Sequence, residues 1–228
     1  MTEETHVSKP SWGLGACDVS RLSAAPWPAY VQALIRTNKG TIDTVAFGLP
    51  RKCASNTMKL AIEQIADTSG YMTTPEMRIW QGTYIAVVRE PISRLQAVWR
   101  HAVVRNKGQY IKLPADMTWE AFVDHVCATP DVASNYHFRS YSDELIDMTG
   151  RMPERTLRCE SLQRDFDSLC VDRGWKRVEL GRLNATEGPP AEVSEAMALR
   201  LRHRYSRDLA SFGYAVAGRR HQAPPRRL

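Results

Sequence analysis

The sequence predicts an α/β domain in which helices flank a mostly parallel sheet, and three observations lead to this fold class. Two short runs, TVAFGL at 44–49 and TYIAVV at 83–88, are predicted strands because they are rich in β-branched and aromatic residues. Each run leads into a segment whose apolar residues recur at helical spacing. The second run is apolar almost throughout, which is typical of a parallel strand buried on both faces. Strands that alternate with helices in this way are the pattern of an α/β domain.

Caps and periodicity predict the helices of the first half of the chain. Ser55 suits an N-cap, and helical spacing continues from there to about Asp67. A second helix with one apolar stripe is expected from Ile92 to Val104. Nearer the N-terminus, YVQALIRT at 30–37 is a predicted short helix.

The second half of the chain is predicted to add a strand and three helices. TWEAFVDHVCAT at 118–129 is an expected helix with its large apolar side chains facing inward. The segment 155–174 is expected to begin as a strand and to continue as a helix that Gly174 ends. A long final helix is expected at 191–211.

Composition places these elements in one domain at 41–216. The chain has 228 residues, 43% of them hydrophobic, which is enough for a core that needs no disulfide or metal. Residues 1–40 are expected to be an N-terminal extension, and the Pro- and Arg-rich segment 217–228 a disordered tail. Five cysteines without a C-x-x-C pair indicate reduced thiols in a cytoplasmic protein, with no metal expected. No secretory signal and no apolar run near the roughly 18 residues of a membrane span is visible.

The formal net charge of +6 suits an anionic partner without selecting one. Nucleotides, phosphate or sulfate esters, nucleic acid and anionic membranes all remain compatible with it. A nucleic-acid-binding protein is one alternative, but the basic residues are scattered and no RNP, helix-turn-helix or zinc-finger pattern is present. We therefore expect no nucleic-acid partner.

The segment GLPRKCASNTMK at 48–59 joins the first strand to the first helix and is rich in groups that bind anions. It carries adjacent cations at Arg51 and Lys52, polar donors at 55–57, and Lys59. A helix N-terminus adds unpaired backbone N–H groups and the positive end of its dipole. The segment is predicted to hold a phosphate or phosphosulfate, although an N-capped helix with solvated lysines fits the same letters.

Three more specific motifs do not fit this segment. A Walker A loop and a dinucleotide fingerprint both require glycines that the segment lacks. A cysteine phosphatase would use Cys53 as nucleophile, but Lys59 stands where an arginine should clamp the phosphate. A lowered thiol pKa near a helix N-terminus keeps that alternative open, and Cys53 is interpreted as a spacer.

A second basic turn follows the second strand. Arg89 ends the strand and Arg94 lies in the next helix. Side chains at the carboxyl ends of neighbouring strands share one crevice, and an arginine fork suits a phosphate monoester. A surface ion pair between Arg89 and Glu90 is the alternative. The two turns together indicate a ligand with anionic groups at both ends.

These two motifs resemble those of the carbohydrate sulfotransferases. RKCASNTMK is similar to the 5′-phosphosulfate loop of that family, and VREPISRLQAVWR to its 3′-phosphate motif. Further similar segments follow in the family's order: HFRSYSDEL from 137, RCESLQRDFDSL from 158, LNAT from 183 and YSRDLASFGY from 205. The resemblance covers about 42–214.

The resemblance implies a P-loop-like three-layer sandwich, the donor 3′-phosphoadenosine 5′-phosphosulfate, and sulfuryl transfer to a hydroxyl of a carbohydrate or related acceptor. It also implies a soluble, bacterial relative of membrane-anchored enzymes. Lys52 would contact the phosphosulfate and stabilise the leaving oxygen, and Arg89 would hold the 3′-phosphate. The remaining donor contacts would come from the loop, namely Arg51, Cys53, Ala54, Ser55, Asn56 and Thr57.

One position departs from the family pattern. The family has a serine eight residues after the motif arginine, where this chain has Ala97. Ser93 lies one turn earlier on the same helical face, so we expect Ser93 to substitute for it. An ordinary serine in a first helical turn is the alternative, and the departure would then weaken donor binding or mark an inactive member.

The acceptor hydroxyl needs a general base near neutral pKa. His137 is the expected base because it lies in a segment that the family uses. His101 and Glu90 are further candidates, although His101 is expected to lie far from the sulfuryl group. Arg139 is predicted to bind an anionic acceptor, and His101 is a second candidate for acceptor binding; a surface charge and a structural histidine are the alternatives.

A nucleotide-dependent phosphotransferase is the remaining alternative function, and the missing Walker glycines argue against it. The sequence identifies neither the acceptor nor the oligomeric state.

Overall fold

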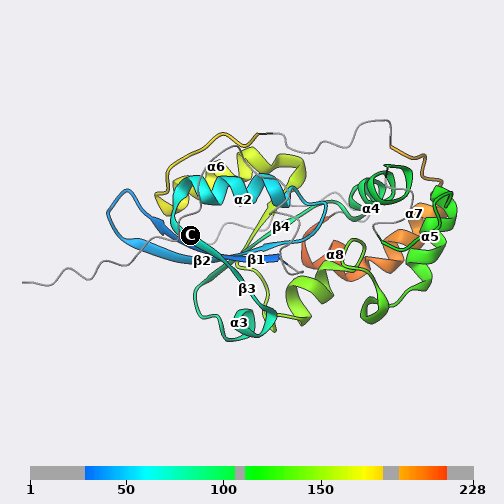
Figure 1. The fold of residues 1–228 in the computed structure, drawn as a ribbon, viewed down its shortest axis with the longest axis horizontal. Coiled ribbons are helices and arrows are strands. Elements are labelled where there is room, and N and C mark those ends of the chain that lie inside the picture. Colours follow the sequence, from blue (N-terminus) through cyan, green and yellow to red (C-terminus); the bar gives the residue numbers. More distant parts are fainter. Residues whose placement is uncertain (1–28, 106–110, 182–189, 215–228) are drawn as a thin grey trace, which may run out of the picture.

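A five-stranded open sheet forms the centre of the computed structural model, which describes residues 29–105, 111–181 and 190–214 (Figure 1). The strands lie in the order β3-β1-β2-β4-β5. Their bounds are β1 Ala29–Arg36, β2 Ile42–Leu49, β3 Ala66–Met72, β4 Thr83–Val88 and β5 Arg155–Arg158. The fold is α/β, and the expected strands at 44–49, at 83–88 and at the start of 155–174 are confirmed.

The sheet is mixed, so the expectation of a mostly parallel sheet is wrong. β1 pairs antiparallel with β2 and with β3, whereas β2 pairs parallel with β4, and β4 with β5. β1 and β2 are joined by a tight turn in which the Thr37 amide donates to the Thr41 carbonyl at 2.8 Å. So short a connection can join only antiparallel strands. The parallel pairings still bring the carboxyl ends of β2, β4 and β5 to one edge.

The predicted helix at 30–37 is wrong, because these residues form β1. Buried side chains alternate along it at Val31, Ala33 and Ile35, with period two. β1 lies between β2 and β3, so the sheet begins before residue 41. Residues 1–28, the tail at 217–228 and the LNAT segment lie outside the described residues.

Helices cover both faces of the sheet. α2 (Ser55–Ile65) and α6 (Leu162–Arg173) lie on one face, and α3 (Thr74–Ile79) lies on the other (Figure 1). α6 ends at Gly174 with φ 68°, the left-handed conformation expected of a C-terminal glycine. Two expectations for α2 are wrong: its N-cap is Ala54 rather than Ser55, and it passes into β3 after Ile65.

A second group of helices lies beyond the carboxyl ends of the parallel strands (Figure 1). It comprises α4 (Pro91–Trp99), η1 (Arg100–Arg105), α5 (Trp119–Ala128), α7 (Glu195–Arg204) and α8 (Ser206–Ser211). The remaining helical segments are the 3₁₀ turns η2 (Asp131–Ala133) and η4 (Cys159–Ser161) and the π-helix η3 (Ser142–Asp147). The helix expected at 92–104 is α-helical only to Trp99 and then π-helical. The expected final helix begins at Glu195 and is divided at Tyr205.

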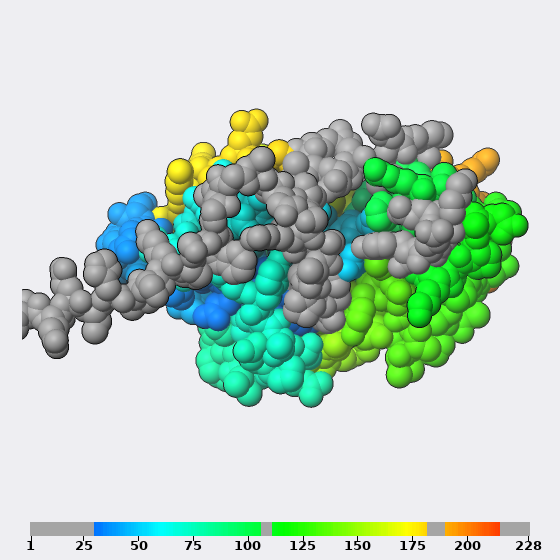
Figure 2. Space-filling view, viewed as in Figure 1, coloured from blue at the N-terminus to red at the C-terminus, as the bar shows by residue number. Residues whose placement is uncertain are grey.

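Two hydrophobic clusters stabilise these halves. The first packs the sheet against α2 and α6, and the second lies among α4, α5 and α7. Figure 2 shows from the same side how the blue and cyan residues of the sheet half adjoin the green residues of the helical half. The carboxyl ends of the parallel strands β2, β4 and β5 lie between the two clusters, and packing in both clusters fixes their position.

Candidate anion-binding site

The candidate site lies where β2 and β4 end, and it is built on two strand-to-helix turns. β2 leads through residues 50–54 into α2, and β4 leads through Arg89 and Glu90 into α4. Because the strands are parallel neighbours, both turns lie at the same edge. The Arg89 guanidinium Nη1 donates to the Lys52 carbonyl at 3.4 Å, so the structure brings these two predicted site residues together.

The turn after β2 is tight without glycine because two other residues adopt the left-handed conformation. Lys52 has φ 64° and Ala54 has φ 55°. A side chain with a Cβ atom occupies this region at a cost of about 1–2 kcal/mol per residue. Such strain gathers at functional sites, where the surrounding structure maintains it. The missing Walker glycines therefore do not prevent a compact turn in front of α2.

The first turn of α2 carries no acidic residue, and its N-cap, Ala54, offers no side-chain hydrogen bond to the helix amides. Thr57 is buried and its hydroxyl donates to the Gly181 carbonyl at 3.2 Å. Ser55 and Asn56 are half-buried at the helix start. This end of α2 therefore has the positive dipole end and donors that an anion requires, with Thr57 already engaged.

Positive charge is concentrated around Lys52. Burial, together with the nearby charges of Arg51, Arg105 and Arg89, lowers the pKa of Lys52 to about 7. Burial likewise lowers the pKa of Lys59 to about 8, with Arg51 adding to the effect and Glu63 opposing it. An anion bound beside Lys52 would offset this repulsion and favour the protonated amine.

Cys53 lies inside the turn and is inert as a nucleophile. It is completely buried, and its Sγ lies 2.9 Å from the Tyr141 hydroxyl. Burial raises the pKa of Cys53 to about 12, against smaller lowering effects of Arg94 and Tyr141. Since the thiolate is the reactive form, the structure gives no support to the cysteine phosphatase alternative.

The turn after β4 is arranged differently, because a carboxylate caps α4. Glu90 accepts hydrogen bonds from the amides of Ile92 at 3.1 Å and Ser93 at 2.7 Å. Glu90 is a candidate base and a candidate ion-pair partner of Arg89, but its carboxylate is used to cap the N-terminus of α4. Ser93 is half-buried, and Ala97 is 2% exposed. An anion at this turn would meet the Arg89 side chain rather than open helix amides.

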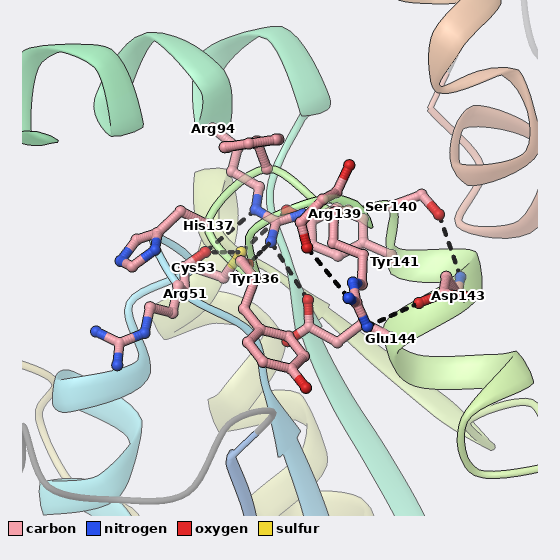
Figure 3. Close-up of polar contacts among 12 residues, drawn as sticks. Arg51, Cys53, Arg94, Tyr136, His137, Arg139, Ser140, Tyr141, Asp143 and Glu144 are labelled. Carbon is pink, nitrogen blue, oxygen red and sulfur yellow. Dashed lines mark hydrogen bonds and ion pairs between the residues drawn. The ribbon is translucent and has the colours of Figure 1, made fainter. Parts of the chain in front are cut away.

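Arg94 is a buried organising residue that holds the first turn against a distant segment (Figure 3). Its Nε donates to the Arg51 carbonyl at 3.2 Å, and its Nη1 and Nη2 donate to the carbonyls of Arg139 at 2.8 Å and Tyr136 at 3.0 Å. The Nη2 atom also lies 3.4 Å from Glu144. Arg94 therefore positions other site residues and is not itself presented to a ligand.

The segment held by Arg94 brings His137 next to Arg51 (Figure 3). His137 is 5% exposed, and its Nδ1 lies 2.6 Å from the Asn135 side-chain oxygen. Burial, together with the nearby Arg51, Lys52, Arg94 and His101, lowers the pKa of His137 to about 2. The imidazole is consequently neutral at physiological pH, and in this cationic setting it is a weak proton acceptor.

The two residues expected to bind the acceptor lie in different settings. The Arg139 guanidinium donates to the Ser134 carbonyl at 3.1 Å and pairs with Asp143 at 3.4 Å, so its charge is used within its own segment. His101 is half-buried on η1. Burial lowers the pKa of His101 to about 4, with Lys52, Arg105 and Arg51 contributing. His101 is thus electrostatically coupled to Lys52 rather than remote from it.

Three residues near the site have no predicted site role. They are Arg94, Tyr141 and Arg105. The first two act through contacts with residues more than 40 positions away, for which a single sequence holds no signal. Arg105 is the last residue of the π-helix η1, and no feature of the sequence indicates that helix.

Comparison with family models, with curated proteins and with solved structures finds no match to this chain. Within the described ranges, no helix is long and apolar enough to cross a membrane. In the same part of the chain, His, Cys, Asp and Glu side chains form no group of three or more that could hold a metal ion. The site is therefore characterised by its own geometry and charge.

Proposed function

We propose that this protein is a sulfotransferase that takes a sulfuryl group from 3′-phosphoadenosine 5′-phosphosulfate and transfers it to a hydroxyl of a carbohydrate or related acceptor. The observation that carries the proposal is the meeting of two cationic turns, those of Lys52 and Arg89, at one edge of a parallel strand pair. A donor with anionic groups at its 3′ and 5′ positions matches two such turns. The finer fold assignment, a P-loop-like three-layer sandwich, belongs to the same proposal.

The residues at this edge fit the donor. Its 5′-phosphosulfate would lie against the uncapped start of α2, where backbone amides, Ser55 and Asn56 offer donors beside Lys52. Its 3′-phosphate would meet the guanidinium of Arg89, whose fork suits two parallel hydrogen bonds. Ser93 is the hydroxyl offered at that end in place of the serine that Ala97 replaces.

Bound donor supplies an activated sulfuryl group, and the task of the protein is to align it and to neutralise charge. Lys52 in its protonated form would stabilise the charge on the leaving oxygen. The helix start would hold the transferring group in line with the acceptor hydroxyl. His137 would accept the hydroxyl proton; burial is the main cause of its lowered pKa, and donor charge would offset the further lowering by the nearby cations.

Titration calorimetry with adenosine 3′,5′-bisphosphate, the product form of the donor, tests the proposal. The wild-type protein is expected to bind it with one-to-one stoichiometry. Lys39→Ala, in the exposed turn between β1 and β2, is the control for a loss of positive charge away from the site. Absence of binding by the wild type would overturn the proposal.

Transfer from labelled donor to a panel of polysaccharides, lipids and small alcohols then identifies the acceptor. Adenosine triphosphate in place of the donor tests the phosphotransferase alternative. Phosphate transfer without sulfate transfer would establish that alternative instead.

A further inference from the structure

We propose that Tyr141 is a positioning residue that holds the Lys52 turn and Arg89 at a fixed separation, so that one ligand with two anionic groups binds both. This inference rests on the proposed function, which supplies such a ligand. It concerns the coupling between the two ends of the site rather than either end alone. Tyr141 is the residue before η3, and its hydroxyl contacts Cys53 in the first turn and Arg89 in the second.

The Tyr141 hydroxyl makes three contacts, and they span both turns. It lies 2.9 Å from Cys53 Sγ, and it accepts from the Arg89 amide at 3.1 Å and donates to the Arg89 carbonyl at 3.0 Å. A phenol has one proton to donate and lone pairs to accept. With the phenol proton on the Arg89 carbonyl, the single thiol proton of Cys53 faces both the phenol oxygen at 2.9 Å and the Arg51 carbonyl at 3.5 Å. One side chain thus joins the residue after Lys52 to the backbone of Arg89.

Both partners keep the protonation states that this arrangement needs. Burial raises the pKa of Cys53 to about 12, so the thiol retains its proton. Burial also raises the pKa of Tyr141 well above its ordinary value, so the phenol stays neutral. The bridge is therefore unchanged across the physiological range of pH.

Hydrogen bonds and ring packing fix the position of Tyr141, so it can fix the positions of the residues that it contacts. It is 0% exposed, and its amide donates to Asp208 at 2.8 Å. Its ring lies under the Arg94 guanidinium, 4.3 Å from the centroid, and packs edge-on against Phe212. Arg94 also donates to the Arg51 carbonyl, so the Lys52 turn is tied to this ring at two points. Replacing Tyr141 by phenylalanine would remove only the hydroxyl and keep this packing.

The energetic consequence concerns ligands that span both turns. A ligand with two anionic groups gains affinity when both subsites are held at the spacing it requires, because the second contact is then intramolecular. A ligand with one anionic group gains nothing from that spacing. Loss of the Tyr141 hydroxyl should therefore weaken a bisphosphate selectively.

The test measures three ligands on Tyr141→Phe by titration calorimetry: adenosine 3′,5′-bisphosphate, adenosine 5′-monophosphate and adenosine 3′-monophosphate. We expect about tenfold weaker binding of the bisphosphate and less than about threefold change for each monophosphate. Tyr84→Phe is the matched control, because that buried hydroxyl donates to the Leu145 carbonyl at 3.1 Å and touches neither turn. Thermal melts of both variants give the folded fraction that the affinities refer to.

A loss of bisphosphate affinity below about threefold overturns the inference, as does an equal loss for all three ligands. If the wild type itself binds no bisphosphate, the proposed function is overturned, which is a distinct outcome. Should Tyr141→Phe fail to fold, Cys53→Ala provides the test, since it removes one of the three contacts. A selective loss for the bisphosphate then supports the inference, and an unselective or absent loss overturns it.

A double variant separates positioning from general loosening. In an Arg89→Ala background the 3′ subsite has lost its cation, so the spacing of the two turns no longer matters. Tyr141→Phe should then change bisphosphate affinity by less than about threefold. A full tenfold loss in that background would show that Tyr141 does not act through Arg89.

Discussion

Two strand-to-helix turns lie side by side at the carboxyl edge of the sheet, and they begin their helices in opposite ways. Before α2, Ala54 adopts a left-handed conformation and no side chain caps the helix. Before α4, Glu90 directs its carboxylate onto the amides of Ile92 and Ser93. The first helix start is open to an anion, whereas the second already holds a negative charge. Although the two turns have similar topology, the first offers helix amides to an anion and the second offers the guanidinium of Arg89.

The largest effect expected from this comparison is that of Lys52→Ala on sulfuryl transfer. Lys52 is the cation beside the open helix start, where charge on the leaving oxygen would develop. Loss of such a stabilising group lowers turnover by about 100-fold or more. The measurement is a labelled-sulfate transfer rate at saturating donor, with Lys39→Ala as control. A variant rate within about tenfold of wild type would remove Lys52 from this role.

The second effect is a selective loss of affinity in Arg89→Ala. A hydrogen bond to a charged group contributes about 1.5–3 kcal/mol, so we expect adenosine 3′,5′-bisphosphate to bind roughly 10- to 100-fold more weakly. Adenosine 5′-monophosphate, which lacks the 3′ group, should change by less than about threefold. Calorimetry with both ligands checks this. Equal losses for the two ligands would mean that Arg89 serves the fold rather than the 3′ end.

The third effect is a dependence of binding on pH. Burial and nearby cations lower the Lys52 pKa from 10.5 to about 7, so above that pH the ligand-free amine is mostly neutral. A bound anion favours the charged amine, so binding takes up a proton, and affinity falls as pH rises, by up to about tenfold per unit. The same shift makes the protein more stable as pH rises from 7 towards 10.5, because the unfolded chain holds that proton more tightly.

Calorimetry at pH 8 in two buffers of different ionisation enthalpy measures this proton uptake. At that pH the phosphates of the ligand are fully ionised, because their second pKa is about 6. Lys52→Ala should take up close to one proton less than wild type, while any uptake by Lys59, whose pKa is lowered to about 8, is common to both proteins. Equal uptake in the two proteins would assign the proton to another group.

The smallest effect distinguishes the two caps. Glu90→Ala should lower the free energy of unfolding by about 1 kcal/mol, since it removes the cap of α4. Ser55→Ala should change it by less than about 0.5 kcal/mol, because Ser55 is the first helical residue and not the N-cap. Urea unfolding of both variants compares them directly. A larger loss in Ser55→Ala would indicate a capping role that its position does not provide.

Local signals in the sequence predicted the parallel half of the fold well. β4 matches the expected run at 83–88 residue for residue, because a short buried apolar strand needs no partner to be recognised. Gly174 ends α6 as expected, since glycine tolerates the left-handed conformation there. The helix predicted at the position of β1 is wrong, although the buried side chains of β1 alternate, because eight residues of mixed polarity fit either period.

The sequence predicted the cationic residues of the site but not the residues that hold them in position. The cations of the two turns could be read from their positions after strands. Ala54 as N-cap could not, because propensity favours Ser55 and only the tight turn overrides it. Arg94 and Tyr141 hold the turns from outside the local sequence, so their roles depend on the folded chain.

The mixed direction of the sheet has a consequence for the order of folding. β1 and β2 form a hairpin, and the pairings of β1 with β3 and of β2 with β4 join positions that are moderately separated, such as Tyr30 with Met72 and Val45 with Thr83. β4 reaches β5 only after α4, η1 and α5 have intervened, which makes that pairing a slow, long-range event. Lys52 and Arg89 both belong to the early unit, because β4 pairs with β2, whereas Tyr141 lies in the later part of the chain. The contacts by which Tyr141 holds the two ends of the site would thus form only as folding finishes, and binding of a ligand that spans both turns would report that last step.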